Sequence, residues 1–186
     1  MVVIRLFTIT MVGWWLAAFA CPAAEMIPAD IEKLSTNAQL VVQGRALSLT
    51  IQRNPAGVIY TAVDFQVDDV WRGQLGTNHI EIRYAGGILG EQGLYVTSEV
   101  EFNVGEEAVV FLLQAPENAW VCVGMSQGKF EVQPGPDKAQ KLVHNPFHGQ
   151  GQELLPISSL SKGTVALPAS SPLTVGDLKK SVQEAK

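Results

Sequence analysis

The chain has 186 residues, of which 47% are hydrophobic and 17% are charged. This composition is typical of one folded globular domain with additional terminal segments, and it argues against a disordered chain. The formal net charge is −5 and the 13 basic residues form no cluster, so the sequence predicts no nucleic-acid partner and no attraction to an anionic membrane surface.

The first 20 residues have the layout of a secretory signal peptide. Arg5 is followed by an uncharged apolar run from Leu6 to Ala20, with small residues near its end. This run has fifteen residues, fewer than the roughly 20 that a membrane-spanning helix needs. We therefore expect an exported protein, periplasmic or secreted, with cleavage after residue 20 or as late as residue 24. No membrane insertion is expected after cleavage.

Two cysteines, Cys21 and Cys122, are too few for a disulfide framework. Cleavage after residue 20 would make Cys21 the mature N-terminus, where it is available either for a bridge to Cys122 or for a lipid anchor. Later cleavage would leave Cys122 alone. Because Cys122 lies between two valines on an apolar stretch, we expect it to behave there as a small buried residue.

The pattern after the signal peptide changes from helical to β spacing. Residues 27–37 predict a short helix, since apolar residues recur at helical spacing and Pro28 suits the first turn. Residues 40–51 predict a long first strand with a bulge near a glycine. Residues 59–71 predict a second strand that forms a hairpin with the first and has its own bulge at Asp68-Asp69.

Further strands complete a barrel domain predicted at 38–133. The third is expected at 78–84, with His79 on its solvated face. The glycine-rich stretch at 85–93 predicts a mobile loop that leads into an edge strand at 99–104. The continuous apolar run at 108–113 is typical of a strand buried on both faces. The last two strands are expected at 120–125 and 129–132.

The remainder of the chain has a different composition. Residues 134–172 are rich in Pro, Gly and Ser, which predicts a long excursion or linker. Residues 173–186 predict a C-terminal amphipathic helix. Thr174 and Asp177 resemble a capping box, and three apolar residues lie on one helical face: Val175, Leu178 and Val182.

The stretch GMSQG at 124–128 is a literal match to the G-x-S-x-G motif of serine hydrolases, with Ser126 as the nucleophile. Asp137 and His144 follow in the order Ser, Asp, His. The motif requires a helix after the serine, whereas the residues after Gly128 alternate as a strand. We therefore interpret GMSQG as a glycine-flanked bend between two strands, and a small serine hydrolase using Ser126 stays as an alternative.

His144 and His148 have a spacing found in metal sites, but Pro146 opposes the helix that would direct both rings at one ion. No cysteine or carboxylate cluster accompanies them. We therefore interpret this stretch as a loop and predict no metal site and no cofactor. Trp71 and Trp120 are candidates for a binding face, although large aromatic residues on strands more often fill or cap the core.

Four stretches of the chain, within residues 30–133, carry a resemblance to a known family: AQLVVQGRA, FQVDDVWRG, FNVGEEAVVFLL and GMSQGKFEV. They resemble secreted bacterial proteins with an OB-fold barrel akin to the netrin-like module. The resemblance implies a mainly β fold with a five-stranded or slightly larger, partly open OB-like barrel, to which the two predicted helices are added. The helix that the family has between its third and fourth strands is replaced here by the glycine-rich stretch at 85–93.

The best-known netrin-like proteins are the tissue inhibitors of metalloproteinases, in which a mature N-terminal cysteine chelates the protease zinc. The resemblance assigns that role to Cys21, although Ala23 stands where that family has a second cysteine. Our leading hypothesis is an exported, non-enzymatic module that binds an unidentified protein or envelope ligand through its barrel loops, with no catalytic residue. A protease-inhibitor-like protein using Cys21 and a serine hydrolase using Ser126 are the alternatives.

Overall fold

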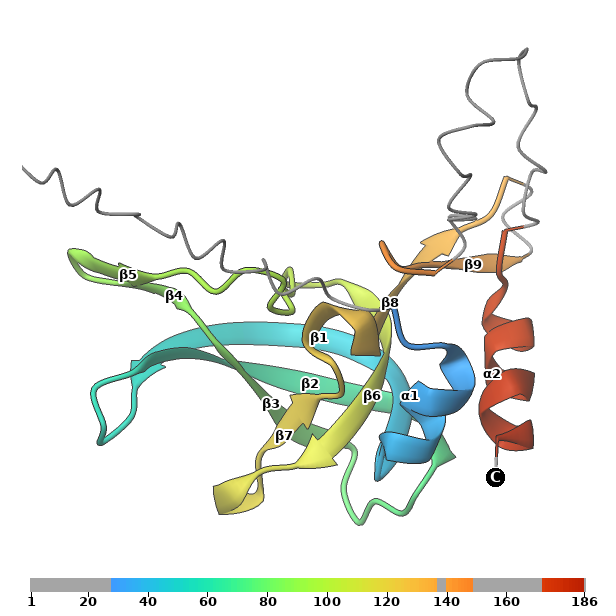
Figure 1. Ribbon diagram of the computed structural model, residues 1–186, viewed down its shortest axis with the longest axis horizontal. Helices are drawn as coiled ribbons and strands as arrows, with labels where there is room; N and C mark the ends of the chain where they lie inside the picture. Colours follow the sequence, from blue (N-terminus) through green and yellow to red (C-terminus); the bar gives the residue numbers. More distant parts are fainter. Residues whose placement is uncertain (1–27, 137–139, 149–171, 186) are drawn as a thin grey trace, which may run out of the picture.

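The computed structural model describes residues 28–136, 140–148 and 172–185. The predicted signal peptide, Cys21 and Asp137 lie outside these residues. The described chain is mainly β, with two α-helices (Figure 1), which confirms the predicted fold class. The helices are α1 (Ile31–Asn37) and α2 (Val175–Glu184), with short 3-10 turns η1 (Pro116–Asn118) and η2 (Met125–Gly128). The strands are β1 (Leu40–Arg53), β2 (Ile59–Arg72), β3 (His79–Ala85), β4 (Gly87–Leu89), β5 (Gln92–Leu94), β6 (Glu107–Gln114), β7 (Trp120–Cys122), β8 (Lys129–Pro134) and β9 (Lys141–His144).

Five of these strands close into a barrel. Their order is β1-β2-β3-β7-β6, and β6 pairs back with β1. All neighbours are antiparallel except β3 and β7, which are parallel and meet at one bridge, Ile82 to Trp120. The barrel is therefore closed at this bridge and open beyond it, as expected for an OB-like barrel. β8 and β9 extend the sheet from β6.

The bulges predicted in β1 and β2 are both present, at two different places in the hairpin. In β1, Leu47 has no partner between the pairs Ala46–Phe65 and Ser48–Asp64. Gln43 pairs with Asp69 and Gly44 pairs with Val67, so that Asp68 has no partner across the strands. A Cβ atom on Gly44 would lie 2.0 Å from the Gln66 carbonyl oxygen, and only glycine permits this close approach. Each bulge bends the strand that carries it, and both long strands take part in the barrel.

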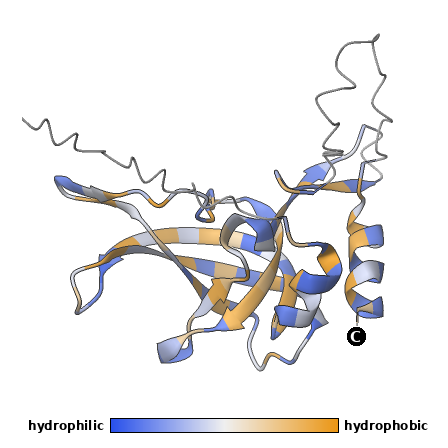
Figure 2. Cartoon of the chain, in the orientation of Figure 1, coloured by the Kyte–Doolittle hydropathy of each residue, from blue (hydrophilic) through white to orange (hydrophobic). Residues whose placement is uncertain are grey.

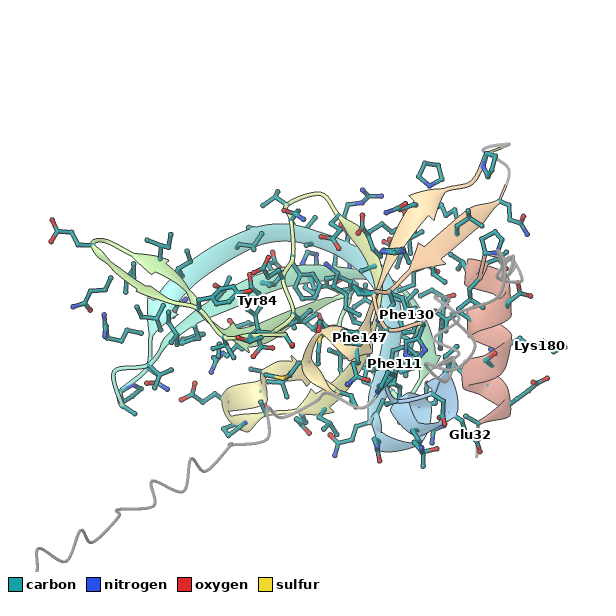
Figure 3. All side chains as sticks on the ribbon, turned by 45° about the horizontal axis from the view of Figure 1, so that its top comes forward. Glu32, Tyr84, Phe111, Phe130, Phe147 and Lys180 are labelled. Atoms are coloured by element: carbon teal, nitrogen blue, oxygen red, sulfur yellow. The ribbon has the colours of Figure 1, made fainter. Side chains whose placement is uncertain are left out.

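Two apolar clusters lie on opposite sides of the barrel wall. Inside, residues from β1, β2, β3 and β6 pack together with Val100 and Phe102. Outside, α1 and α2 cover the sheet, and Phe111 and Phe130 meet there with ring centroids 5.6 Å apart (Figure 3). β6 contributes alternate residues to each cluster, and it is apolar between its polar end residues Glu107 and Gln114 (Figure 2). The prediction of a strand buried on both faces is confirmed.

Side-chain caps fix where the helices begin. The Asp30 carboxylate accepts a hydrogen bond from the Lys33 N–H at 2.7 Å, so α1 begins at residue 31 and the expected start at 27 was too early. The predicted cap of α2 is confirmed, because the Thr174 hydroxyl oxygen accepts from the Asp177 N–H at 3.1 Å and the hydroxyl donates to the Asp177 carboxylate at 2.7 Å. Leu178 and Val182 of α2 are buried against the sheet.

Two expectations for the segments between strands need correction. Residues 85–93 contain β4 and the start of β5, which form a small hairpin at the end of the molecule away from the helices (Figure 1). The predicted strand at 99–104 does not form. Its alternation arises because Val100 and Phe102 enter the barrel core without a ladder of backbone hydrogen bonds. Within the stretch at 134–172, which the sequence predicts as an excursion or linker, β9 pairs with β8 and buries Val143.

No helix in the described part of the chain has the length and apolar character that crossing a membrane requires.

Candidate functional site

A cavity of about 590 Å³ lies where β3 and β7 separate. We call it the β3–β7 cleft. Its walls are the ends of these two strands, the loop between β1 and β2 with the adjoining strand residues Arg53 and Tyr60, the loop between β6 and β7, and two further residues, Glu99 and Met125. The lining residues are Arg53, Asn54, Pro55, Val58, Tyr60, Arg83, Tyr84, Ala85, Glu99, Ala115, Pro116, Glu117, Val121, Cys122 and Met125.

The two arginines of the cleft have different partners. Arg83 is ion-paired with Glu81 and, at 2.7 Å, with Glu117, and its guanidinium lies 5.4 Å from the centre of the Tyr60 ring. These hydrogen bonds, that of Glu117 above all, raise the pKa of Arg83. Arg53 donates to neutral acceptors, the carbonyl of Gly57 and the side-chain oxygen of Gln92. Within the described chain, Arg53 has no acidic partner.

Tyr84 separates the cleft from a second cavity. That cavity, of about 480 Å³, lies beneath the β4–β5 hairpin and shares Tyr84, Ala85 and Glu99 with the cleft. Tyr84 points inward from β3 (Figure 3), and its ring centre lies 6.2 Å from that of Phe102. Partial burial raises the pKa of the Tyr84 hydroxyl. The second cavity therefore extends the cleft toward the interior of the barrel.

Cys122 is partly buried on β7 at the wall of the cleft. Desolvation, with a smaller contribution from the Glu99 carboxylate, raises the pKa of its thiol to about 12. The thiolate is the reactive form of cysteine. Little of the Cys122 thiol is therefore in the reactive form near neutral pH.

The GMSQG stretch forms the turn η2 between β7 and β8, which confirms the predicted bend. Its glycines have structural reasons. Gly124 has a φ of 63°, a conformation that side chains disfavour. A Cβ atom on Gly128 would lie 2.3 Å from the Val123 carbonyl oxygen. The backbone of the turn therefore requires glycine at both positions of the motif.

Hydrogen bonds tie the polar side chains of η2 to distant segments. The Ser126 hydroxyl donates to the Ser98 carbonyl at 2.8 Å. The Gln127 side-chain oxygen accepts from the Ala29 N–H at 2.6 Å, at the start of the described chain. Both side chains are thereby used to hold segments together.

Ser126 and His144, which the sequence analysis associated, do line one cavity, of about 410 Å³. Glu131 lines it as well and is the cross-strand partner of His144 in the β8–β9 pair. Ser126 nevertheless directs its hydroxyl hydrogen to a carbonyl oxygen, and the described residues show no hydrogen bond between Ser126 and His144. Asp137, the third predicted member, lies outside the described residues.

The two histidines of the HNPFH stretch lie in different surroundings. His144 ends β9 and is exposed. His148 packs its ring on Phe130, with centroids 5.0 Å apart, and its half-burial lowers the pKa of the imidazole. No group of three potential metal ligands occurs in the part of the chain that the structure describes.

The tryptophans and His79 lie largely as expected. Trp71 is 7% exposed in the outer cluster, where its indole N–H donates to Asp69 at 3.0 Å. Trp120 packs against the inner cluster. The two tryptophans therefore belong to different sides of the barrel wall and form no common binding face. His79 is exposed, beside Asp64 at 3.1 Å.

Most residues of the β3–β7 cleft were not singled out from the sequence. Tyr60, Arg83 and Glu117 come from three separate elements, and nothing in their spacing indicates that they meet. The turn residues around Pro55 were the one local signal, and they indicated a loop without indicating a site. Comparison of the chain with models of protein families and with curated proteins found no match.

Proposed function

We propose that the protein is an exported, non-enzymatic binding module of the cell envelope or the secreted fraction, and that it takes its ligand in the β3–β7 cleft. One observation carries the proposal: the cavity of about 590 Å³ lies at the open side of the barrel, between two loops and two strand ends. Small-ligand and peptide sites commonly have volumes of about 300–1,000 Å³, and OB-like barrels commonly bind ligands with these loops and with the face next to them.

The chemistry around the cleft supports binding in preference to catalysis. A nucleophile needs an adjacent base or a lowered pKa. The thiol of Cys122 has a pKa of about 12, and the hydroxyl of Ser126 donates to a backbone carbonyl. Neither side chain has this activation among the described residues, while the apolar residues of the cleft are available to a ligand.

Site-specific photocross-linking tests the proposal. A photoreactive phenylalanine analogue is placed at position 58 in the cleft, where Val58 is 44% exposed, and as a control at position 104, where Val104 is 67% exposed and outside the cleft. Irradiation in the native host should give a discrete adduct at position 58 and none at position 104. The absence of an adduct at position 58, or equal adducts at both positions, would contradict the proposal.

The serine hydrolase is a second candidate, because Ser126, Glu131 and His144 line one cavity. If a fluorophosphonate probe labels the protein and the labelling is lost in Ser126→Ala, the serine hydrolase is favoured over the binding module. The inhibitor-like alternative depends on Cys21, and the intact mass of the mature protein tests it. A mature chain that starts beyond residue 21 removes it.

A further inference from the structure

We propose that the ligand of the β3–β7 cleft is an extended segment of a partner protein, which adds as a β-strand to the open edge of β3 and places an acidic side chain against Arg53. This inference rests on the proposed function, because it names the ligand of the same cleft. Among the described residues, two strand edges that are unpaired past the bridge, an apolar lining and one cation without an acidic partner support it.

The hydrogen bonds between β2 and β3 show which way the backbone of β3 points. The Gly86 N–H donates to the Ile59 carbonyl at 3.0 Å, and at the other end the Val67 N–H donates to the Asn78 carbonyl at 2.8 Å. Residues of an antiparallel strand alternate between bonding to one neighbour and facing the other side. The even-numbered residues of β3 therefore bond to β2, and the backbone groups of Arg83 and Ala85 point away from β2, toward β7.

The same reasoning applies to β7. The Ala115 N–H donates to the Ala119 carbonyl and the Val123 N–H donates to the Phe111 carbonyl, both at 2.8 Å. The odd-numbered residues around β7 therefore bond to β6, and the backbone of Cys122 faces β3.

In the cleft, the backbone N–H and C=O groups of β3 and β7 do not bond to each other, because the pairing of the two strands is limited to the bridge between Ile82 and Trp120. Past this bridge the strands separate, and Ala85 and Cys122 line opposite walls of the cavity. Unpaired strand edges are templates for an added strand. Because the bridge to Trp120 engages the Arg83 N–H, a peptide at this edge would pair with the Arg83 carbonyl and with the backbone of Ala85.

The lining of the cleft suits the side chains of such a strand. Pro55, Val58, Pro116, Val121 and Met125 provide an apolar surface. Alternate side chains of a strand point to opposite faces. Every second side chain of the peptide would therefore contact this apolar surface or enter the second cavity, which Tyr84 separates from the cleft.

Charge identifies one further property of the peptide. The charge of Arg83 is balanced by two carboxylates, whereas Arg53 bonds to neutral oxygens only, within the described residues. Glu99 also lines the cleft, and its carboxylate accepts from the Val100 N–H at 3.0 Å. A carboxylate on the peptide near the β1–β2 loop would form a charge-assisted pair with Arg53.

The test selects peptides that bind the purified mature protein from a displayed library of random seven-residue sequences. Peptides that also bind the Ala85→Pro variant are removed by counter-selection. Proline at position 85 removes the N–H that faces the cleft and leaves the ladder with β2 intact. We expect enriched peptides with one recurrent Asp or Glu. N-methylation of alternate peptide amides should weaken binding at least tenfold, and methylation of the intervening amides should not.

Arg53→Gln checks the acidic contact. This substitution should weaken the binding of an enriched peptide at least tenfold. It should not change the binding of the same peptide when its Asp or Glu is replaced by Asn or Gln. The inference is overturned if no peptide is enriched, if binding survives Ala85→Pro in a folded variant, or if alternate methylation has no effect. A glycan or lipid adduct at position 58 would overturn the inference and leave the binding function standing, whereas the absence of an adduct would remove both.

Discussion

The side-chain amide of Asn145 donates a hydrogen bond to the backbone carbonyl of Gln127, 2.9 Å away and 18 residues earlier in the chain. The same amide nitrogen lies 2.7 Å from the Lys129 carbonyl and 3.3 Å from that of Ser126. Asn145 is 1% exposed. This side chain joins the turn after β9 to η2, and it makes residues 140–148 part of the barrel domain.

Asn145→Asp should lower the free energy of unfolding by about 3 kcal/mol, because it keeps the shape of the side chain while removing a buried donor that faces three carbonyl oxygens. Gln140→Glu makes the same chemical change at an exposed position and should change stability by less than about 0.5 kcal/mol. Urea denaturation monitored by tryptophan fluorescence measures both. Equal effects of the two substitutions would show that Asn145 does not hold η2.

Gly128→Ala and Gly176→Ala should change stability in opposite directions. A Cβ atom at 128 would lie 2.3 Å from the Val123 carbonyl oxygen, whereas the nearest atom to a Cβ at 176 in α2 is 3.7 Å away. We expect Gly128→Ala to destabilise by more than about 2 kcal/mol and Gly176→Ala to stabilise by about 0.5–1 kcal/mol. Thermal unfolding followed by circular dichroism separates them. A neutral Gly128→Ala would argue against a structural reason for this glycine of GMSQG.

The ion pair between Lys129 and Glu106 is largely buried, with side-chain exposures of 14% and 7%. Glu106→Gln alone should cost about 3 kcal/mol, because it leaves the Lys129 ammonium without its partner. The double variant with Lys129→Met should lose clearly less than the sum of the single variants, giving a coupling energy of about 1–3 kcal/mol in a double-mutant cycle.

The exposed pair of Lys180 and Glu184 on α2, 3.9 Å apart with exposures of 75% and 68%, is the matched control for that cycle. Its coupling energy should be below about 0.5 kcal/mol. Similar coupling energies in the two cycles would contradict the importance of burial.

His148 should make the protein less stable in mild acid. Burial lowers the pKa of its imidazole below the ordinary value of 6.5, so the unfolded chain binds a proton more readily than the folded one. The contribution of the neutral His148 ring to the free energy of unfolding is full above pH 6.5. It decreases as the pH falls from 6.5 through the lowered pKa of the folded state. His148→Phe keeps an aromatic ring on Phe130 and should reduce the difference between the unfolding free energies at pH 7.5 and pH 5. An unchanged difference would assign the acid sensitivity to other groups.

Cys122 should react slowly with iodoacetamide in the folded protein. Its thiol pKa of about 12 compares with an ordinary value of 9.0, so the thiolate fraction near pH 8 is smaller by about three orders of magnitude. Labelling followed by intact mass should be roughly a thousandfold slower in buffer than in 8 M urea. Comparable rates would show that the thiol is free and reactive, and would reopen a catalytic or disulfide role for it.

Local sequence patterns determined much of the fold. Alternation located β1, β2 and β3, the apolar run at 108–113 located β6, and Thr174 with Asp177 located the start of α2. These features depend on short-range rules: strand side chains alternate with a period of two, and a capping side chain bonds to a backbone N–H within one turn. The sequence also indicated that GMSQG is a bend, because a strand pattern follows it directly.

Only the tertiary structure determined the cleft and the role of the segment at 95–104. Arg53, Arg83 and Glu117 meet because one parallel bridge, Ile82 to Trp120, closes the barrel and leaves the rest of β3 open. Val100 and Phe102 have the alternation of a strand, but their segment forms no strand in the structure and its side chains fill the barrel core. Which backbone edges find partners depends on contacts between residues far apart in the chain, and the free energy of such contacts is set by register and packing, which spacing in a single sequence does not specify.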